Sequence, residues 1–131
     1  MAVVNEGFVA GDLVKYEAPS YYSRSVGVLI ASKTVVVGST LKGALATVQP
    51  AAAADHASLT CVSLANATTG AGETLSIPVL IRHSVVSDGV VKYSDAAIDA
   101  NGIAKLLTFG IVVRSDVDAK TLAENVAAAY P

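Results

Sequence analysis

The sequence is short of charge, of aromatic side chains and of the residue types on which catalysis usually depends. Only 15% of its 131 residues are charged, tryptophan is absent, and the chain has one cysteine and two histidines. A catalytic group needs a neighbour that tunes its pKa, and so few candidates offer no such pair. Motifs for nucleophile elbows, zinc peptidases, phosphate loops and dinucleotide binding are also missing. We therefore expect a protein that is not an enzyme and holds no cofactor or metal.

The few reactive side chains fit structural roles. Cys61 lies in an apolar run, residues 59–64, which indicates a buried and inert thiol rather than a nucleophile. His56 and His83 have no cysteine or carboxylate at metal-ligand spacing, so a metal site is not expected at either. His83 follows an apolar run directly, and we expect it to lie at the end of a strand.

Long hydrophobic runs and an excess of one charge are absent as well. The chain has 9 basic and 11 acidic residues in an even scatter, which gives no field for direct nucleic-acid binding. Hydrophobic residues reach 53%, but no run approaches the ~18 residues of a membrane span. The first residues lack the basic start and apolar core of a signal peptide, so export is not expected. A surface so poor in charge is normally covered by a partner, so we expect association.

Short β units separated by turns dominate the first two thirds of the chain. Residues 26–45, VGVLIASKTVVVGSTLKGAL, hold two β-branched runs with a turn at Ser32-Lys33 and an end at Gly38-Ser39. A loop or short helix is expected at residues 51–55 and a turn-rich connection at residues 65–73. Three more β features are predicted: strands at 59–64 and 74–82, the latter at an edge or bulged because of Pro78, and a tight hairpin around Asp88-Gly89.

Helical patterns come late in the sequence. Ser94 is predicted to cap a helix that ends at Gly110, with Ile98, Ile103, Leu106 and Leu107 on a broad apolar face. Residues 111–114 return as a strand, and Asp116 or Asp118 is predicted to cap a last helix that runs through Ala129. The sequence thus predicts an α+β fold: a β-rich compact single domain, built as a small sheet or barrel-like β unit with late helices.

The N-terminal residues predict an extended arm. Apolar pairs recur about every five residues in residues 1–15, a spacing that matches neither a helical stripe nor a clean strand. A frayed terminus without a role is the alternative, but a purely solvated tail would avoid so many large apolar side chains. The candidate contact residues of this arm are Val3, Val4, Phe8, Val9 and Leu13.

Residues 16–24 contain three of the five tyrosines. Pro19 fixes its own φ and restricts the preceding residue, which predicts a rigid, irregular loop. Tyrosine and arginine are residue types enriched at protein contact sites, although they also serve to pack a loop onto a sheet. The candidate contact residues here are Tyr16, Pro19, Tyr21, Tyr22 and Arg24.

The order and spacing of four motifs resemble the lambda-type head decoration proteins of tailed bacteriophages. The similarity spans about residues 14–116, and the departures are the alanine-rich insert after Thr47 and the helical extension after Asp116. The motifs are Tyr16-Glu17-x-Pro19-x-x-Tyr22-Ser23-Arg24, Gly38-Ser39-Thr40-Leu41-Lys42-Gly43, Pro78-Val79-Leu80-Ile81-Arg82 and Phe109-Gly110-Ile111-Val112-Val113-Arg114.

This resemblance implies a capsid decoration protein, made in the host cytoplasm and located on the outer surface of the virion. It implies homotrimers that bind the expanded head and cement neighbouring major capsid protein subunits against the pressure of packaged DNA. It also implies that residues 1–15 are a capsid-binding arm, mobile when free, that adds a strand to a capsid element. Residues 16–131 would then form the decoration domain, with the tyrosine segment at a trimer or capsid contact.

Other functions stay open at this point. A self-assembling shell or tail-tube subunit would also be a structural protein without an active site. A small-molecule-binding accessory domain is a third possibility, because short β units with glycine turns recur in such domains. The missing signal peptide disfavours a bacterial adhesion module.

Overall fold

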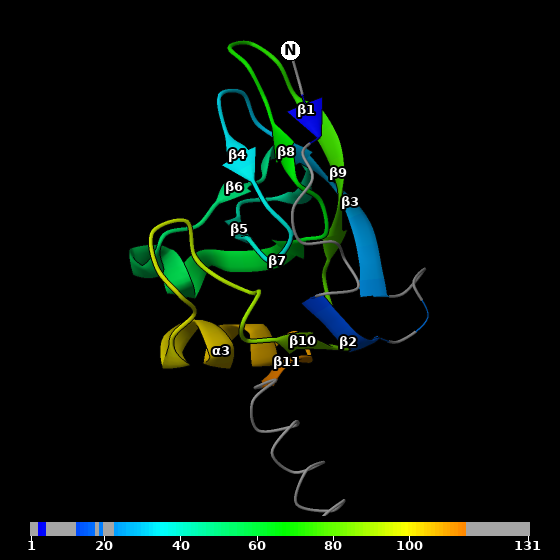
Figure 1. The fold of residues 1–131 in the computed structure, drawn as a ribbon, viewed down its shortest axis with the longest axis vertical. Helices are drawn as coiled ribbons and strands as arrows, with labels where there is room; N and C mark the ends of the chain where they lie inside the picture. The colour runs from blue at the N-terminus through cyan, green and yellow to red at the C-terminus, as the bar shows by residue number, and fades with distance from the viewer. Residues whose placement is uncertain (1–2, 5–12, 18, 20–22, 115–131) are drawn as a thin grey trace, which may run out of the picture.

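Three β-sheets and one α-helix make up the part of the chain that the structure describes. The computed structural model describes residues 3–4, 13–17, 19 and 23–114. The β-rich character expected from the sequence is confirmed, and the sheets are open rather than closed into a barrel. We name them the large sheet, with five strands, and the small and mixed sheets, with three strands each. Figure 1 shows the small sheet at the top, the large sheet across the middle, and the mixed sheet with the helix at the bottom.

The large sheet has the strand order β3-β9-β7-β5-β6, and every pairing in it is antiparallel. Burial along β3 follows the period of two typical of a strand: Gly27 and Leu29 are buried, whereas Val26 is exposed. The strands predicted at residues 59–64 and 74–82 are confirmed as β7 and β9. The bounds are β3 Arg24–Leu29, β5 Thr40–Lys42, β6 Gln49–Pro50, β7 Leu59–Ser63 and β9 Leu75–Leu80.

Pro78 lies at a local edge of the large sheet, as predicted, because the β7–β9 ladder covers only Val79 and Leu80 of β9. Strand β9 lies between β3 and β7, and Pro78 pairs with Val26 without a shift in register. The Pro78 carbonyl accepts a hydrogen bond of 3.0 Å from the Leu64 amide, so the Pro78 backbone faces the β7 side. The missing N–H of Pro78 would point to the same side, beyond the end of β7 at Ser63, so its absence removes no bond from the β3 ladder.

The small sheet has the order β1-β8-β4 and is antiparallel throughout. The expected turn between the two runs of residues 26–45 is confirmed, since Ser32 adopts a positive φ of 60°. The strands on either side of that turn belong to different sheets, however, because β3 pairs with β9 and β4 with β8. The bounds are β1 Val3–Val4, β4 Thr34–Val35 and β8 Ala67–Thr68.

The mixed sheet has the order β11-β10-β2, with β10 parallel to β11 and antiparallel to β2. The tight hairpin predicted around Asp88-Gly89 is wrong. The amides of Val90 and Val91 both donate to the carbonyl of Ser87, so the chain turns without a second strand pairing back onto β10. The bounds are β2 Val14–Glu17, β10 Ser84–Ser87 and β11 Ile111–Arg114.

The helix α3, Ala100–Leu107, begins later than the predicted cap at Ser94. The Ser94 amide donates to the Ala51 carbonyl at 2.8 Å. This bond keeps residues 94–98, which lie between the predicted and the observed cap, out of the helix. Asp99 is the N-cap, and its carboxylate accepts from the Gly102 amide at 2.9 Å and from the Tyr93 hydroxyl at 2.6 Å. The predicted last helix, residues 116–129, lies outside the described residues.

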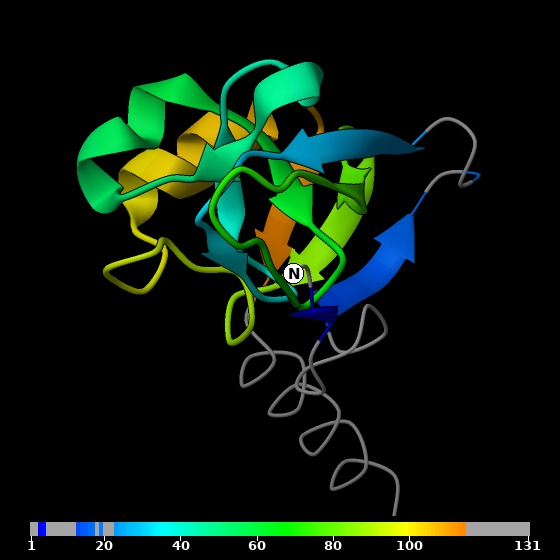
Figure 2. The ribbon, with the colours of Figure 1, turned by 90° about the horizontal axis from the view of Figure 1, so that it is seen from above.

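Two hydrophobic clusters cover the two faces of the large sheet. Two short 3₁₀ helices flank the large sheet: η1 Leu45–Thr47 lies beside β3, and η2 Ala53–Ser58 lies beside α3, close to the loop or short helix predicted at residues 51–55. Figure 2 shows η2 in green beside α3 in yellow. The first cluster, toward the small sheet, comprises Leu29, Val35, Leu41, Val48, Cys61, Ala67, Ile77 and Val79. The second, toward the mixed sheet and α3, includes Leu13, Val62, Leu80, Val86, Tyr93, Leu106 and Ile111.

Gly102 lets α3 pack closely on Tyr93, although glycine is a poor helix former. A Cβ at this position would overlap the Tyr93 hydroxyl and lie 2.5 Å from the Ile98 side chain. We expect Gly102→Ala to lower the free energy of unfolding by about 1–3 kcal/mol despite the better helix propensity of alanine. Ala104→Gly, at an exposed position of the same helix, is the control and should cost about 1 kcal/mol through propensity alone. Urea denaturation measures both, and a Gly102→Ala protein as stable as wild type would contradict this packing.

The hydrogen bond between Tyr93 and Asp99 predicts a dependence of stability on pH. This bond is the main cause that lowers the pKa of Asp99 below 3.8, whereas burial raises the pKa of Tyr93. Because the pKa of Asp99 is lower in the folded protein than in the unfolded chain, its ionised carboxylate stabilises the fold above pH 3.8. This contribution is lost as the pH falls through the pKa of Asp99 in the folded protein. We expect Tyr93→Phe to destabilise the protein at neutral pH and less so at about pH 2.5. Chemical denaturation at both pH values tests this, and an equal difference at both would exclude the linkage.

Candidate functional site

The end of the predicted arm forms the outer strand of the small sheet. Val3 pairs with Thr68 and Val4 with Ala67 in the β1–β8 ladder. Phe8 and Val9 lie outside the described residues. The N-terminal strand therefore docks on the protein's own sheet.

Leu13 is a core residue, which corrects its prediction as a contact residue of the arm. Its side chain is fully buried in the second hydrophobic cluster, directly before β2. Removing a buried leucine from water contributes about 1.5–3 kcal/mol, so this residue anchors the chain to the body. Leu13, which the sequence assigned to the arm, therefore packs as part of the body.

The tyrosine segment connects two different sheets. Tyr16 lies in β2 of the mixed sheet, Arg24 begins β3 of the large sheet, and Pro19 between them is exposed. Tyr21 and Tyr22 lie outside the described residues. The strands that hold Val3–Val4, Tyr16 and Arg24 therefore belong to three separate sheets.

Two buried polar side chains hold β8 in place beside the arm strand. The Asn66 side-chain oxygen accepts from the Val37 amide at 2.8 Å, before β8 begins. After β8 ends, the Thr69 hydroxyl donates to the Ile30 carbonyl at 2.6 Å and accepts from the Lys33 amide at 3.0 Å. Both residues are buried, at 7% and 3% exposure, so these bonds fix a two-residue strand that its own ladder would hold weakly.

The local sequence predicts only a turn-rich connection at residues 65–73, whereas the structure places β8 there between two buried polar side chains. The available signal was an asparagine and threonines on both sides of an apolar alanine, since these side chains readily bond to neighbouring backbone. Their partners lie about thirty to forty positions earlier in the chain, in the segments around β4. Nothing in the local sequence specifies such distant partners.

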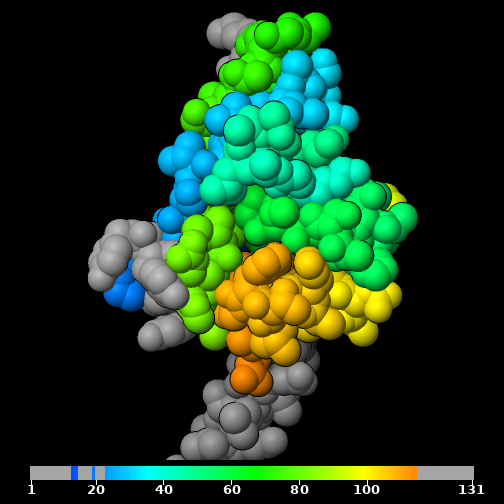
Figure 3. All heavy atoms as spheres, turned by 180° about the vertical axis from the view of Figure 1, so that it is seen from behind, coloured from blue at the N-terminus to red at the C-terminus, as the bar shows by residue number. Residues whose placement is uncertain are grey.

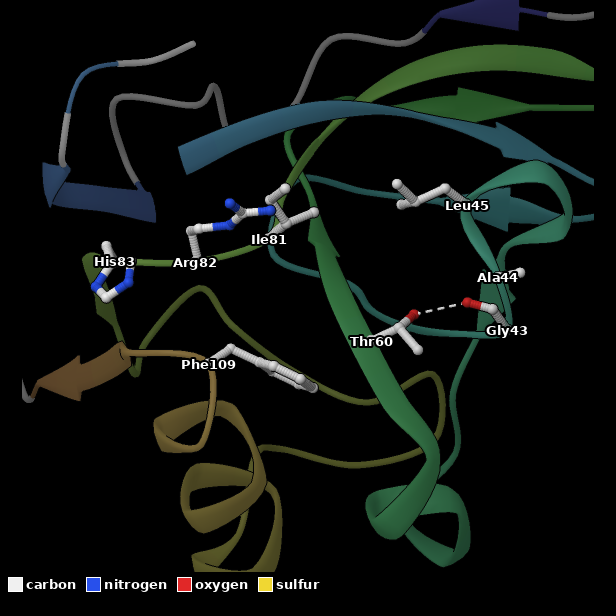
Figure 4. Close-up of a pocket in the computed structure, with 8 residues that line it drawn as sticks. All are labelled: Gly43, Ala44, Leu45, Thr60, Ile81, Arg82, His83 and Phe109. Atoms are coloured by element: carbon white, nitrogen blue, oxygen red, sulfur yellow. Dashed lines mark hydrogen bonds between the residues drawn. The ribbon is translucent and has the colours of Figure 1, made fainter. Parts of the chain in front are cut away.

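An open hollow of about 590 Å³ lies where β7, η1, the β9–β10 connection and the segment after α3 meet. Figure 3 shows this face, with α3 and the following residues in orange below β7 and η1. In Figure 4 the Thr60 hydroxyl donates to the Gly43 carbonyl at 2.8 Å, and the Phe109 ring extends toward Thr60. The lining residues are Gly43, Ala44, Leu45, Thr60, Ile81, Arg82, His83 and Phe109.

The hollow has the character of a contact surface. Leu45 at its rim is 37% exposed, and the Lys105 ammonium lies 5.4 Å from the centre of the Phe109 ring. His83 ends the β9–β10 connection with a positive φ of 48°, close to the strand-end position predicted for it. A shallow, mainly apolar hollow favours contact with another surface.

Metal binding and thiol chemistry receive little support from the described residues. No group of three or more histidine, cysteine or acidic side chains among them is placed to hold a metal ion. Cys61 is fully buried, as expected, and burial raises the pKa of its thiol to about 11. No helix in the described part of the chain is long and apolar enough to cross a membrane.

The state of Cys61 gives a direct test. A thiol with a pKa of about 11 has about a hundredfold less thiolate at neutral pH than one with the ordinary value of 9.0. We therefore expect iodoacetamide to label the folded protein at least a hundredfold more slowly than the protein unfolded in urea. Mass spectrometry of timed samples measures the rates, and equal labelling of both forms would mean that Cys61 is accessible.

The described part of the chain combines open β-sheets and an N-terminal strand at a sheet edge, and the whole chain has few charged residues. This combination is typical of a structural domain that assembles with other proteins. A family model described as bacteriophage lambda head decoration protein D matches residues 3–111, and the chain belongs to this family. Searches of curated proteins and of solved structures found no match. The resemblance identified from the sequence is confirmed, and the family implies a structural role in decorating the phage capsid and a location on the virion.

Proposed function

We propose that this protein binds as homotrimers to the outer surface of the expanded phage head and stabilises it against the pressure of packaged DNA. The observation that carries the proposal is the family match over residues 3–111, which includes both the arm strand and the body. The protein is made in the host cytoplasm and links neighbouring subunits of the major capsid protein. With a net charge of −2, it binds the shell and not the packaged nucleic acid.

The arm makes the capsid contact by strand addition. Backbone hydrogen bonds supply affinity in this mode, and Val3, Val4, Phe8 and Val9 supply apolar contact. The burial of Leu13 supports an arm that ends at residue 12, somewhat shorter than the fifteen residues first assigned. The candidate contacts of the trimer or the capsid outside the arm are Tyr16, Pro19, Tyr21, Tyr22 and Arg24, and the exposure of Pro19 is compatible with that role.

Trimer formation would multiply weak contacts. When one arm has bound, the other two search only the volume that the trimer allows, which raises overall avidity by about 10²–10⁴ over a single arm. A small domain with little charge would in this way hold a shell together. Light scattering of the free protein tests the assembly, because a discrete trimer supports this proposal and an open-ended polymer supports a shell or tail-tube subunit instead.

Deletion of residues 1–12 tests the arm. The body should stay folded, because Leu13 and β2 remain, and binding to expanded heads should weaken at least about a hundredfold through loss of strand addition. Co-sedimentation with expanded heads measures binding, and circular dichroism monitors the fold.

A matched control uses an exposed apolar residue outside the arm. Leu107 is 57% exposed at the end of α3, so Leu107→Ser removes apolar surface without touching the arm and should leave binding within about threefold of wild type. If the protein without residues 1–12 is folded and still co-sediments as wild type does, the arm does not make the capsid contact.

A further inference from the structure

Apolar and cationic side chains meet at the hollow beside Phe109, and no acidic side chain lines it. Leu45 at the rim is exposed, and Phe109 is only partly buried. Arg82 and His83 line the same hollow, and the Lys105 ammonium lies over the Phe109 ring. A partner that fits this surface combines an apolar face with negative charge.

The last segment of the sequence, residues 115–131, has that combination. It lies outside the described residues and beyond the range, residues 3–111, that the family model matches. Three acidic residues and one lysine give this segment a net charge of −2, the same as that of the whole chain. At the spacing of a helix, most of its apolar side chains share one face. They are Ala119, Leu122, Ala123, Val126, Ala129 and Tyr130.

A helix of this length depends on a surface to pack against. Isolated helices shorter than about 12–15 residues are marginally stable in water, and in proteins the packing of the apolar face supplies most of the stability. The helix predicted at residues 116–129 is at this limit. The hollow offers it an apolar surface, together with cations that complement Asp116 and Asp118 at the helix start.

The direction of β11 keeps this helix away from the hollow of its own chain. Phe109 lines the hollow, and β11 then runs away from it for four residues, about 13 Å (Figure 4). A helix capped at Asp116 or Asp118 starts within four residues of Arg114, which are too few to reverse direction and cover that distance. In its own chain the helix would therefore start beside the end of β11, and most of its apolar face would miss the hollow.

We propose that residues 116–130 of one copy form an amphipathic helix that packs in the hollow of a neighbouring copy. Each copy of the trimer then holds the next, in a head-to-tail contact that closes as a ring of three. This inference rests on the proposed function, which supplies the neighbouring copies, and adds a surface and a segment that hold them together. The residues that line the hollow belong to the range that the family model matches, whereas the segment that fills it does not.

Two added cysteines test the contact between copies. Leu45→Cys places a thiol at the rim of the hollow, and Ala123→Cys places one on the apolar face of the segment. When the two proteins are unfolded and refolded together, mild oxidation should form a disulfide that joins one chain of each kind. Cys61 takes no part, because it is fully buried and the pKa of its thiol is about 11.

The matched control replaces Leu45→Cys by Ala71→Cys. Ala71 is exposed in the loop between β8 and β9, at the end of the molecule remote from α3 (Figure 1). Since a disulfide forms only between residues that approach closely, Ala71→Cys should cross-link to Ala123→Cys at least about tenfold less than Leu45→Cys does. Non-reducing gels measure the yield, and mass spectrometry identifies the linked peptides.

Three results would overturn the inference. Absence of a disulfide with Leu45→Cys would mean that the segment does not reach the hollow. Equal yields from Ala71→Cys and Leu45→Cys would mean that the segment meets the body at random. In the double variant, Leu45→Cys with Ala123→Cys, a disulfide within one chain would mean that the segment folds back onto its own body.

Substitutions on the two faces of the predicted helix test what the segment contributes to assembly. Leu122→Ser with Val126→Ser removes the large aliphatic side chains of the apolar face, and Thr121→Ser with Asn125→Ser changes the polar face by the same number of residues. The first variant should dissociate at protein concentrations at least about tenfold higher than wild type, because apolar burial between copies is lost. The second should stay within about threefold of wild type. Sedimentation velocity over a dilution series measures both, and equal dissociation of the two variants would contradict the contact.

Failure of the proposed function is seen separately, in the unmodified chain. A chain that stays monomeric in light scattering at every concentration contradicts the proposed trimer, and this contact with it. A chain that forms trimers but gives no disulfide at Leu45→Cys contradicts this inference alone.

Discussion

Burial of the large sheet on both of its faces is the constraint on which the rest of the structure depends. In β7, Cys61 belongs to the cluster toward the small sheet, whereas Val62 belongs to the cluster toward the mixed sheet and α3, and both side chains are fully buried. Such a sheet needs a layer on each side, because an uncovered apolar face would remain in water. The small sheet, the mixed sheet and α3 supply those layers, and their own positions follow from this requirement.

The small sheet consists of strands too short to be stabilised by their ladder hydrogen bonds alone. Strands β1, β4 and β8 have two residues each, so buried hydrogen bonds from Asn66 and Thr69 complete what the ladders lack. These bonds hold β8 at the place where β1 pairs with it. Leu13 anchors the chain in the opposite cluster, so the arm is attached to the body on both sides of the large sheet.

These features fit the structural role of a capsid decoration protein. Recognition by backbone pairing needs an exposed edge and a rigid support, and it places few demands on the identity of side chains. The low charge of the chain and the mainly apolar hollow beside Phe109 are compatible with a protein whose surfaces are covered by neighbours. The buried Cys61 thiol, with its raised pKa, is a packing group in the same scheme.

The sequence by itself determined the β-rich class, the burial of Cys61, the strands β7 and β9 and the family, because period-two patterns, turn residues and motif order are local properties. The sequence pattern predicted the cap of α3 at Ser94 and not at Asp99. The start of the helix depends on the contact between Ser94 and Ala51, which the local pattern does not show. The sequence pattern also assigned Leu13 to the arm, although Leu13 lies in the core. Only the tertiary structure decided which strands pair, how β9 accommodates Pro78 and how Asn66 and Thr69 support the arm strand, because each depends on contacts between residues far apart in the chain.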